Sequence, residues 1–168
     1  MIIFFKDKGR PKMEVAVFAA GCFWGVEASF NELKGVLETE VGYTGGKQDN
    51  PTYEQVCTGQ TGHAEVVMVK FDPNLISYEL LLEKFWDIHD PTQVNRQGPD
   101  VGTQYRSEIF TTSQTQIAAA AASIAMKEKT QSIKIATKIT PLETFHAAEE
   151  YHQKYFQKNP GRGCNLPI

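Results

Sequence analysis

Long hydrophobic runs and an excess of charge are both missing from this sequence of 168 residues. The apolar run at residues 1–5 is too short for the apolar region of a signal peptide, and no stretch approaches the length of a membrane-spanning helix. The net charge of −3 gives no electrostatic reason to expect nucleic acid or an anionic membrane as a partner. We therefore expect a cytoplasmic protein that binds neither.

Cysteine is also scarce, with three residues, and none of them forms a C-x-x-C pair. In a reducing compartment, an odd number of cysteines argues against a structural disulfide framework. A zinc site is not expected either, because the only neighbouring histidines, His146 and His152, do not have the i, i+4 spacing that would place them on one helical face.

The chain has no internal repeat, low-complexity linker or charge block, so we expect one catalytic domain over residues 1–168. Residues 1–13 are predicted to be a weakly ordered lead-in and residues 159–168 a mobile tail. Segments rich in β-branched and aromatic residues between turn residues predict strands at 14–20, 36–43, 64–71, 105–111 and 133–140.

Helices are predicted from apolar spacing and from capping residues. Residues 26–33 and 81–88 each carry apolar side chains at i, i+4 and i+7. Ser77 and Ser113 are natural N-caps, and Ser113 with Gln116 forms a capping box before an alanine-rich helix.

A last helix is predicted over 143–158, ending at the stop signal Asn159-Pro160-Gly161. This order of elements favours an α+β fold, a two-layer sandwich with a mixed sheet, over a doubly wound parallel sheet.

The most informative feature is Cys22 in the string GCFWG, between the apolar run 14–20 and the predicted helix 26–33. At such a strand-to-helix corner, unpaired backbone N–H groups and the helix dipole favour a thiolate. Phe23 and Trp24 would make one wall of the site apolar. A lone cysteine is usually a small buried hydrophobe, but the flanking glycines and aromatics favour a reactive thiol here.

Four other residues could carry chemistry. Glu65, at the start of a probable core strand, is either outward-facing and solvated, or inward-facing with a raised pKa and able to act as an acid. Tyr53 and Tyr105 are loop or strand-edge tyrosines, most of which simply cover apolar surface. Asp100, in GPDVG, is of a type that more often forms a turn.

The histidines permit a second reading, a Cys–His hydrolase or acyltransferase that uses Cys22 with His63 or His146. His146 and His152 fall on the predicted polar helix, where solvent exposure is expected. Cys164 lies on a tail whose glycines allow large excursions, so it is a natural resolving cysteine for a distant thiol.

Four motifs in order carry a resemblance to a known family: GCFWG, GYTGG, residues 53–65 (YEQVCTGQTGHAE) and residues 98–107 (GPDVGTQYRS). From Val15 to Cys164 the chain resembles peptide-methionine (S)-S-oxide reductase, the A-type methionine sulfoxide reductase. The resemblance implies a ferredoxin-like α+β core and thiol-dependent reduction of the S epimer of methionine sulfoxide, free or in peptides and proteins. It also implies thioredoxin as reductant, protein repair under oxidative stress as the role, and no metal or organic cofactor.

Carried over by position, the resemblance makes Cys22 the nucleophile and Glu65 the acid. It assigns the remaining site roles as follows: the hydroxyls of Tyr53 and Tyr105 hold the sulfoxide oxygen, Asp100 supports them, Phe23 and Trp24 wall the substrate methyl group, and Cys57 is a structural thiol beneath the site.

Longer members carry a second recycling cysteine on a glycine-rich extension. The sequence here offers only Cys164 to resolve the oxidised Cys22. A non-catalytic alternative, a redox-responsive binding protein whose Cys22–Cys164 bridge orders the tail, also stays open. Nothing in the pattern demands more than a monomer.

Overall fold

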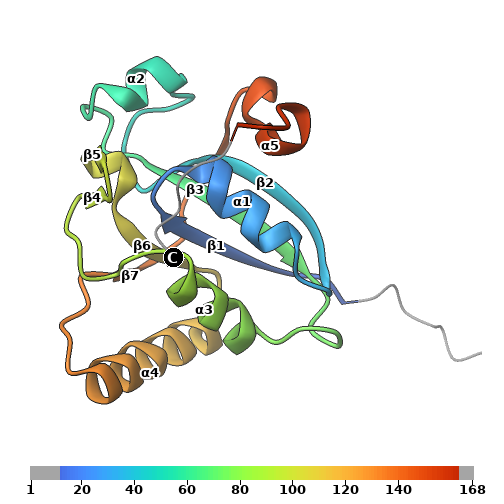
Figure 1. Ribbon diagram of the computed structural model, residues 1–168, viewed down its shortest axis with the longest axis vertical. Coiled ribbons are helices and arrows are strands. Elements are labelled where there is room, and N and C mark those ends of the chain that lie inside the picture. Colours follow the sequence, from blue (N-terminus) through green and yellow to red (C-terminus); the bar gives the residue numbers. More distant parts are fainter. Residues whose placement is uncertain (1–11, 163–168) are drawn as a thin grey trace, which may run out of the picture.

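The computed structural model describes residues 12–162, which form a mixed sheet with helices along it (Figure 1). Its elements, in chain order, are β1 (Glu14–Ala20), α1 (Phe23–Asn31), β2 (Val36–Thr44), α2 (Tyr53–Cys57), β3 (Ala64–Phe71), α3 (Tyr78–Asp87), β4 (Arg96–Gln97), β5 (Asp100–Val101), the 3₁₀ helix η1 (Thr103–Tyr105), β6 (Ser107–Thr111), α4 (Gln114–Gln131), β7 (Lys138–Pro141), β8 (His146–Ala147), the 3₁₀ helix η2 (Glu150–His152) and α5 (Tyr155–Lys158).

The main sheet has the strand order β7-β6-β1-β3-β2-β8. Its four central strands are all antiparallel and, with α1 and α3 as crossovers, make the expected ferredoxin-like core. β7 pairs with β6 in parallel after α4, and β8 pairs with β2 antiparallel, which makes the sheet mixed. The predicted α+β class with a mixed sheet is therefore confirmed.

Strand β1 is apolar from Val15 to Ala20 because both of its faces are covered there. Ala16, Phe18 and Ala20 point into the larger core, which α1, α3 and α4 share on one side of the sheet. Val17 and Ala19 point into a smaller core on the other side, closed by side chains from the connection between β7 and β8. β1 ends at Ala20 and α1 begins at Phe23, so Cys22 lies in the short connection between them.

The two longest helices, α3 and α4, have the predicted serine side chains as N-caps. Ser77 accepts a hydrogen bond from the backbone of Leu80, and Ser113 accepts one from the backbone of Gln116. The expected capping box at Ser113 is only half formed, because the Gln116 side chain accepts from Thr112 N and donates to Val15 O on β1. Gln116 thus ties α4 to the sheet instead of closing its own cap.

The predicted helix over 143–158 is wrong. Its first part is β8, which adds to the edge of β2, and its later part holds η2 and the four-residue α5. Lys154 has a left-handed backbone with φ of 53°, which no helix interior accepts. We call residues 146–158 the C-terminal strap.

Two predicted strands are shorter than expected. The one at 105–111 begins at residue 107 because η1 precedes it, and the one at 133–140 is confined to β7. The connection between β2 and β3 contains α2, and the connection between α3 and β6 contains the β4–β5 hairpin. No helix in the described part of the chain is long and apolar enough to cross a membrane.

Candidate active site

Cys22 occupies the corner between β1 and α1. It is the N-cap residue of α1, it is half-buried, and its carbonyl accepts a hydrogen bond from Val26 N. Gly21 makes this corner possible: it has a left-handed backbone with φ of 97°, and a Cβ there would come within 2.9 Å of the Gln97 side chain. The thiol therefore stands at the amino end of the helix dipole, as the sequence predicted.

Glu65 points inward. Its side chain lies on the same face of β3 as Val67 and Val69, and only 2% of the residue is exposed. Its Oε1 accepts a hydrogen bond of 3.2 Å from the backbone N–H of Phe23, the first residue of α1. The hypothesis that Glu65 faces outward into solvent is therefore excluded. The carboxyl group binds the backbone of Phe23, the residue that directly follows Cys22, at the start of α1.

Tyr53 and Tyr105 come to this carboxyl group from two separate segments, α2 and η1. Burial raises the pKa of both phenols, and Glu65, when it is ionised, raises each pKa further. The charge of Cys22 also raises the pKa of Tyr105, and the charge of Tyr105 raises the pKa of Tyr53. Both hydroxyls thus stay protonated at neutral pH and can donate hydrogen bonds in the neighbourhood of Cys22 and Glu65.

Asp100 begins β5, and its charge also raises the pKa of Tyr105. The hairpin that carries Asp100 is held by Gln97, whose side-chain amide accepts from Asp90 N and donates to Asp90 O at 2.9 Å each. Gln97 is also the residue that packs against Gly21. The hairpin and the Cys22 corner are therefore in direct contact.

The two aromatic residues after Cys22 differ in their surroundings. Phe23 is buried in the main core, 5.7 Å from the ring of Tyr43, whereas Trp24 is half-buried. Trp24 stacks on Tyr155 with ring centroids 3.8 Å apart, and its indole N–H donates to Nδ1 of His152 at 2.9 Å. Both partners belong to the C-terminal strap.

Glu149, in the C-terminal strap, is hydrogen-bonded to Tyr43 and to Tyr53. Its carboxylate accepts a hydrogen bond from Tyr43 Oη at 3.1 Å and another from the backbone N–H of Tyr53 at 3.0 Å. Burial alone would raise the pKa of Glu149, but these hydrogen bonds together lower it, so the group is charged at neutral pH. Glu149 thereby fixes the start of α2, and with it Tyr53.

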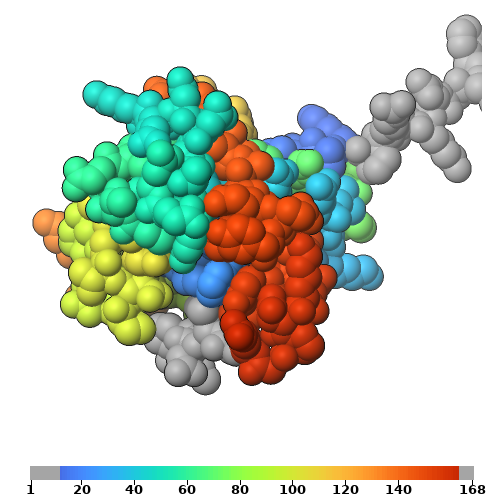
Figure 2. All heavy atoms as spheres, turned by 90° about the horizontal axis from the view of Figure 1, so that it is seen from above, coloured from blue at the N-terminus to red at the C-terminus, as the bar shows by residue number. Residues whose placement is uncertain are grey.

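The surface at this end of the molecule reflects the same arrangement. In Figure 2, the segments around α2, the β4–β5 hairpin and the C-terminal strap surround a small area formed by early residues of the chain. These three segments are far apart in sequence. They meet where β1 ends and α1 begins.

Cys57 differs from the expectation. It was predicted to lie beneath the site, but it is exposed at the end of α2. Its thiol is hydrogen-bonded to Tyr53, and partial burial raises its pKa. Cys164 lies outside the described residues.

His63 does not support the hydrolase reading. Its Nδ1 accepts from the backbone N–H of Gly46 at 3.0 Å, so its Nε2 donates to the carbonyl of Gln48 at 2.6 Å. Both ring nitrogens are occupied by backbone groups, and neither is available to activate Cys22. His146 packs edge-on against His63, with ring centroids 5.3 Å apart.

Sequence reasoning missed His152 and Glu149, both assigned to the wrong helix. His152 was expected in solvent, but it is 1% exposed. One signal could have identified it, since three aromatic residues within 151–156 are too many for a solvent-facing helix. In residues 12–162, no cluster of three histidine, cysteine or carboxylate side chains could hold a metal ion.

Comparison with known proteins gives a consistent result. A family model described as peptide methionine sulfoxide reductase matches residues 14–168. The peptide methionine sulfoxide reductase MsrA of Methanothermobacter thermautotrophicus is 57% identical over 157 residues, covering 92% of this chain and 93% of the relative. That of Alkaliphilus metalliredigens is 51% identical, covering 93% of this chain and 99% of the relative.

Solved structures agree with these matches. Reduced Mxr1 from Saccharomyces cerevisiae has a TM-score of 0.87 and 38% identity, covering 93% of this chain and 90% of Mxr1. Methionine sulfoxide reductase A of Corynebacterium diphtheriae has a TM-score of 0.81 and 37% identity, covering 95% and 85%. Mxr1 has also been solved in complex with Trx2, with a TM-score of 0.62 and 26% identity, covering 90% and 91%.

Proposed function

This chain belongs to the peptide methionine sulfoxide reductase family and reduces methionine sulfoxide, and we propose that Cys22 and Glu65 carry the first chemical step. The observation on which this rests is the hydrogen bond from Phe23 N to Glu65, which holds the carboxyl group at the start of α1 beside the Cys22 corner. A nucleophile and an acid at one helix start meet the needs of this reaction.

The step transfers one oxygen atom. The sulfoxide sulfur becomes electrophilic when its oxygen is protonated or strongly hydrogen-bonded. The Cys22 thiolate attacks the substrate sulfur and forms an S–S bond while Glu65 delivers a proton to the sulfoxide oxygen. The protonated oxygen then transfers to the Cys22 sulfur as the S–O and S–S bonds to the substrate sulfur break, which leaves a sulfenic acid on Cys22. Methionine leaves as the reduced product, and Cys22 has supplied the two electrons that reduced it.

Tyr53 and Tyr105 hold the sulfoxide oxygen through their protonated hydroxyls, and Asp100 supports Tyr105. Two observations support this role: both phenols keep their protons at neutral pH, as a hydrogen-bond donor must, and both lie close enough to Glu65 for its charge to affect them. Phe23 and Trp24 seat the substrate methyl group. Fixing both the oxygen and the methyl group around a stereogenic sulfur selects one epimer, and we assign the S epimer.

Recycling uses the resolving cysteine. The thiol of Cys164 attacks the Cys22 sulfenic acid, a disulfide forms, and water leaves with the oxygen. Thioredoxin then reduces the disulfide. The complex of the relative Mxr1 with Trx2 supports this partner.

The direct test is Cys22→Ser. A serine hydroxyl is not a nucleophile at neutral pH and cannot accept the oxygen, so single-turnover reduction of a methionine S-sulfoxide should fall below detection. Cys57→Ser is the matched control, and it should reduce the sulfoxide at the wild-type rate. Reduction by a folded Cys22→Ser protein would remove Cys22 from the mechanism.

A further inference from the structure

His152 is enclosed by aromatic rings behind the candidate substrate wall. Its ring centroid lies 4.4 Å from that of Tyr53, 5.2 Å from Phe23 and 4.1 Å from Tyr151. Only 1% of the residue is exposed. A histidine in such surroundings contributes no charge to the surface, and its polar contacts have to be made inside the protein.

One of these contacts fixes the proton on the ring. Nδ1 of His152 accepts the indole N–H of Trp24 at 2.9 Å, so Nδ1 has no proton and the neutral ring carries its proton on Nε2. Burial lowers the pKa of His152, although the charges of Glu149 and Glu54 act in the opposite direction. At neutral pH the ring is therefore a neutral acceptor for Trp24. Nε2 is buried and has no hydrogen-bond partner in the described part of the chain.

The position of Trp24 depends on two residues of the strap. Tyr155 stacks on the indole with an angle of 6° between the ring planes, which limits tilting. Stacking alone still allows the indole to rotate in its own plane. The hydrogen bond to His152 removes this freedom, because it needs the indole N–H in one direction.

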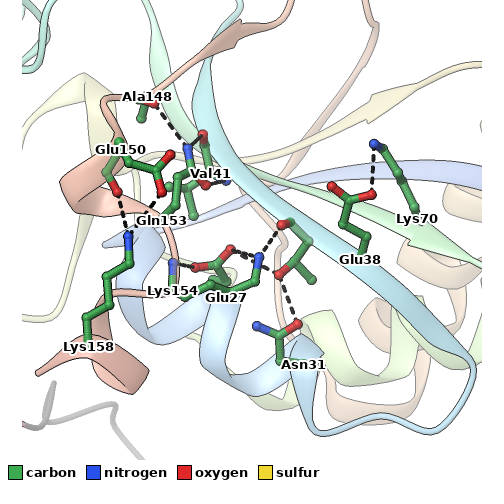
Figure 3. Close-up of polar contacts among 11 residues, drawn as sticks. Glu27, Asn31, Glu38, Val41, Lys70, Ala148, Glu150, Gln153, Lys154 and Lys158 are labelled. Carbon is green, nitrogen blue, oxygen red and sulfur yellow. Dashed lines mark hydrogen bonds and ion pairs between the residues drawn. The ribbon is translucent and has the colours of Figure 1, made fainter. Parts of the chain in front are cut away.

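The strap itself is anchored to the sheet and to α1 (Figure 3). The side-chain amide of Gln153 accepts from Val41 N and donates to Val41 O, both at 2.9 Å, in the manner of a paired strand. The next residue, Lys154, donates from its backbone to Glu27 Oε1 at 2.6 Å and from Nζ to Glu27 Oε2 at 3.2 Å. His152 is thus held by its two following neighbours.

Glu27 makes this anchor specific for α1. It lies one turn after Trp24 on the same helix, its side chain is 2% exposed, and it also accepts from Thr39 Oγ1 at 3.0 Å. A buried carboxylate needs these partners, so a shift of the strap would leave Glu27 with Thr39 but without both of its hydrogen bonds from Lys154. Hydrogen bonds at Trp24–His152 and at Glu27–Lys154 therefore join α1 to the strap, in addition to the stacking of Trp24 on Tyr155.

We propose that His152 is a positioning residue for sulfoxide reduction, which as a neutral imidazole fixes the orientation of Trp24 and so shapes the wall that seats the substrate methyl group. The proposal rests on the role assigned to Trp24 above. It predicts that loss of the acceptor weakens substrate binding more than it slows the chemical step, because the wall contacts the methyl group before and during the attack.

The test measures single-turnover reduction of a blocked methionine S-sulfoxide at increasing concentration in four variants: His152→Leu, His152→Asn, Trp24→Phe and the double variant Trp24→Phe with His152→Leu. In His152→Leu, the half-saturating concentration should rise about five- to tenfold with little change in limiting rate, as expected for one lost hydrogen bond. Asn places an oxygen near the position of Nδ1, so His152→Asn should remain within about threefold of wild type.

The double variant decides whether His152 acts through Trp24. Phenylalanine has no N–H, so adding His152→Leu to Trp24→Phe should cost less than about twofold. An equal cost in both backgrounds would overturn the proposal. If Trp24→Phe alone leaves the half-saturating concentration unchanged, the role of Trp24 in the proposed function is wrong, whereas a strong effect of Trp24→Phe with no effect of His152→Leu refutes only the positioning role.

A second readout does not depend on activity. The chain has two tryptophans, and Trp86 donates to Ser123 between α3 and α4, away from the site. In a Trp86→Phe background, Trp24 is the only tryptophan, and its emission should shift to the blue in His152→Leu but not in His152→Asn. Unchanged emission in a folded His152→Leu protein would contradict the hydrogen bond on which the proposal depends.

Discussion

The backbone N–H of Phe23 donates to Oε1 of Glu65 at 3.2 Å, which places a buried carboxyl group at the first turn of the helix that begins after Cys22. These residues belong to α1 and to β3. The relationship arises because β3 pairs with β1 in the sheet, so the start of β3 lies at the end of β1. The candidate acid is thus held by the central part of the sheet.

The first prediction concerns Glu65→Gln. The amide oxygen can still accept the hydrogen bond from Phe23 N, but the side chain cannot deliver a proton, so the single-turnover rate should fall by about 10²–10⁴-fold. Glu108→Gln is a matched control, because Glu108, on β6, is 5% exposed and pairs with Arg106. A loss below about threefold for Glu65→Gln would mean that another group supplies the proton.

The second prediction concerns the two tyrosines. Each hydroxyl can partly replace the other, so Tyr53→Phe and Tyr105→Phe should each slow the single-turnover step less than the double variant does. Because Tyr53 is also hydrogen-bonded to Cys57, Cys57→Ser serves as the control for that contact. Wild-type rates in the double variant would exclude the hydroxyls as donors to the oxygen.

The third prediction separates the cysteines. Cys164→Ser should still reduce about one sulfoxide per enzyme, because the first step needs only Cys22 and the acid. With thioredoxin it should then stall, since a sulfenic acid offers no disulfide for exchange, while dithiothreitol restores turnover. Cys57→Ser should keep both activities. Normal thioredoxin-driven turnover in Cys164→Ser, with a stall in Cys57→Ser, would show that Cys57 and not Cys164 is the resolving cysteine.

The fourth prediction concerns stability and pH. His89 is 6% exposed; its Nδ1 donates to Phe85 O at 2.6 Å, and its Nε2 accepts from Ser107 at 2.8 Å. Burial lowers the pKa of His89 from 6.5 to about 4, although the Phe85 carbonyl and the nearby charge of Asp90 act in the opposite direction. Between these two values the unfolded chain binds the proton more strongly, so the stability from this residue is complete above pH 6.5 and decreases as the pH falls toward 4.

The measurement is the urea midpoint and slope at pH 7.5 and pH 5 for wild type and His89→Gln. From pH 7.5 to pH 5, the wild type should lose about 2 kcal/mol more unfolding free energy than the variant. The comparison between the two proteins cancels the other titrating groups, Asp90 among them. Equal losses in both would show that His89 does not titrate in this range.

The strands that the sequence predicted best are those with both faces buried. β1 and β3 have the predicted boundaries, because a continuous apolar run between turn residues leaves few alternatives. The positions of two candidate site residues, Cys22 shortly after β1 and Glu65 within β3, were therefore predicted together with the fold. Their positions follow from strand ends and need little knowledge of distant contacts.

The C-terminal strap could not be predicted in this way. Residues 143–158 contain many good helix formers, so local propensity favours a helix. The observed structure depends on contacts with distant parts of the chain, such as Gln153 with Val41 and Lys154 with Glu27. His152 was misplaced for the same reason, since its partner Trp24 is 128 residues away.

The close approach of Gly21 to Gln97 makes the absence of a side chain a structural requirement. A methyl group at residue 21 would act as a wedge between the thiol and the hairpin that carries Asp100. Both the oxygen and the nitrogen of the Gln97 side-chain amide are hydrogen-bonded to the backbone of Asp90, so the side chain could move only with the whole hairpin. Alanine at this position would then push the hairpin away from the Cys22 corner and leave every reacting group chemically intact but out of reach.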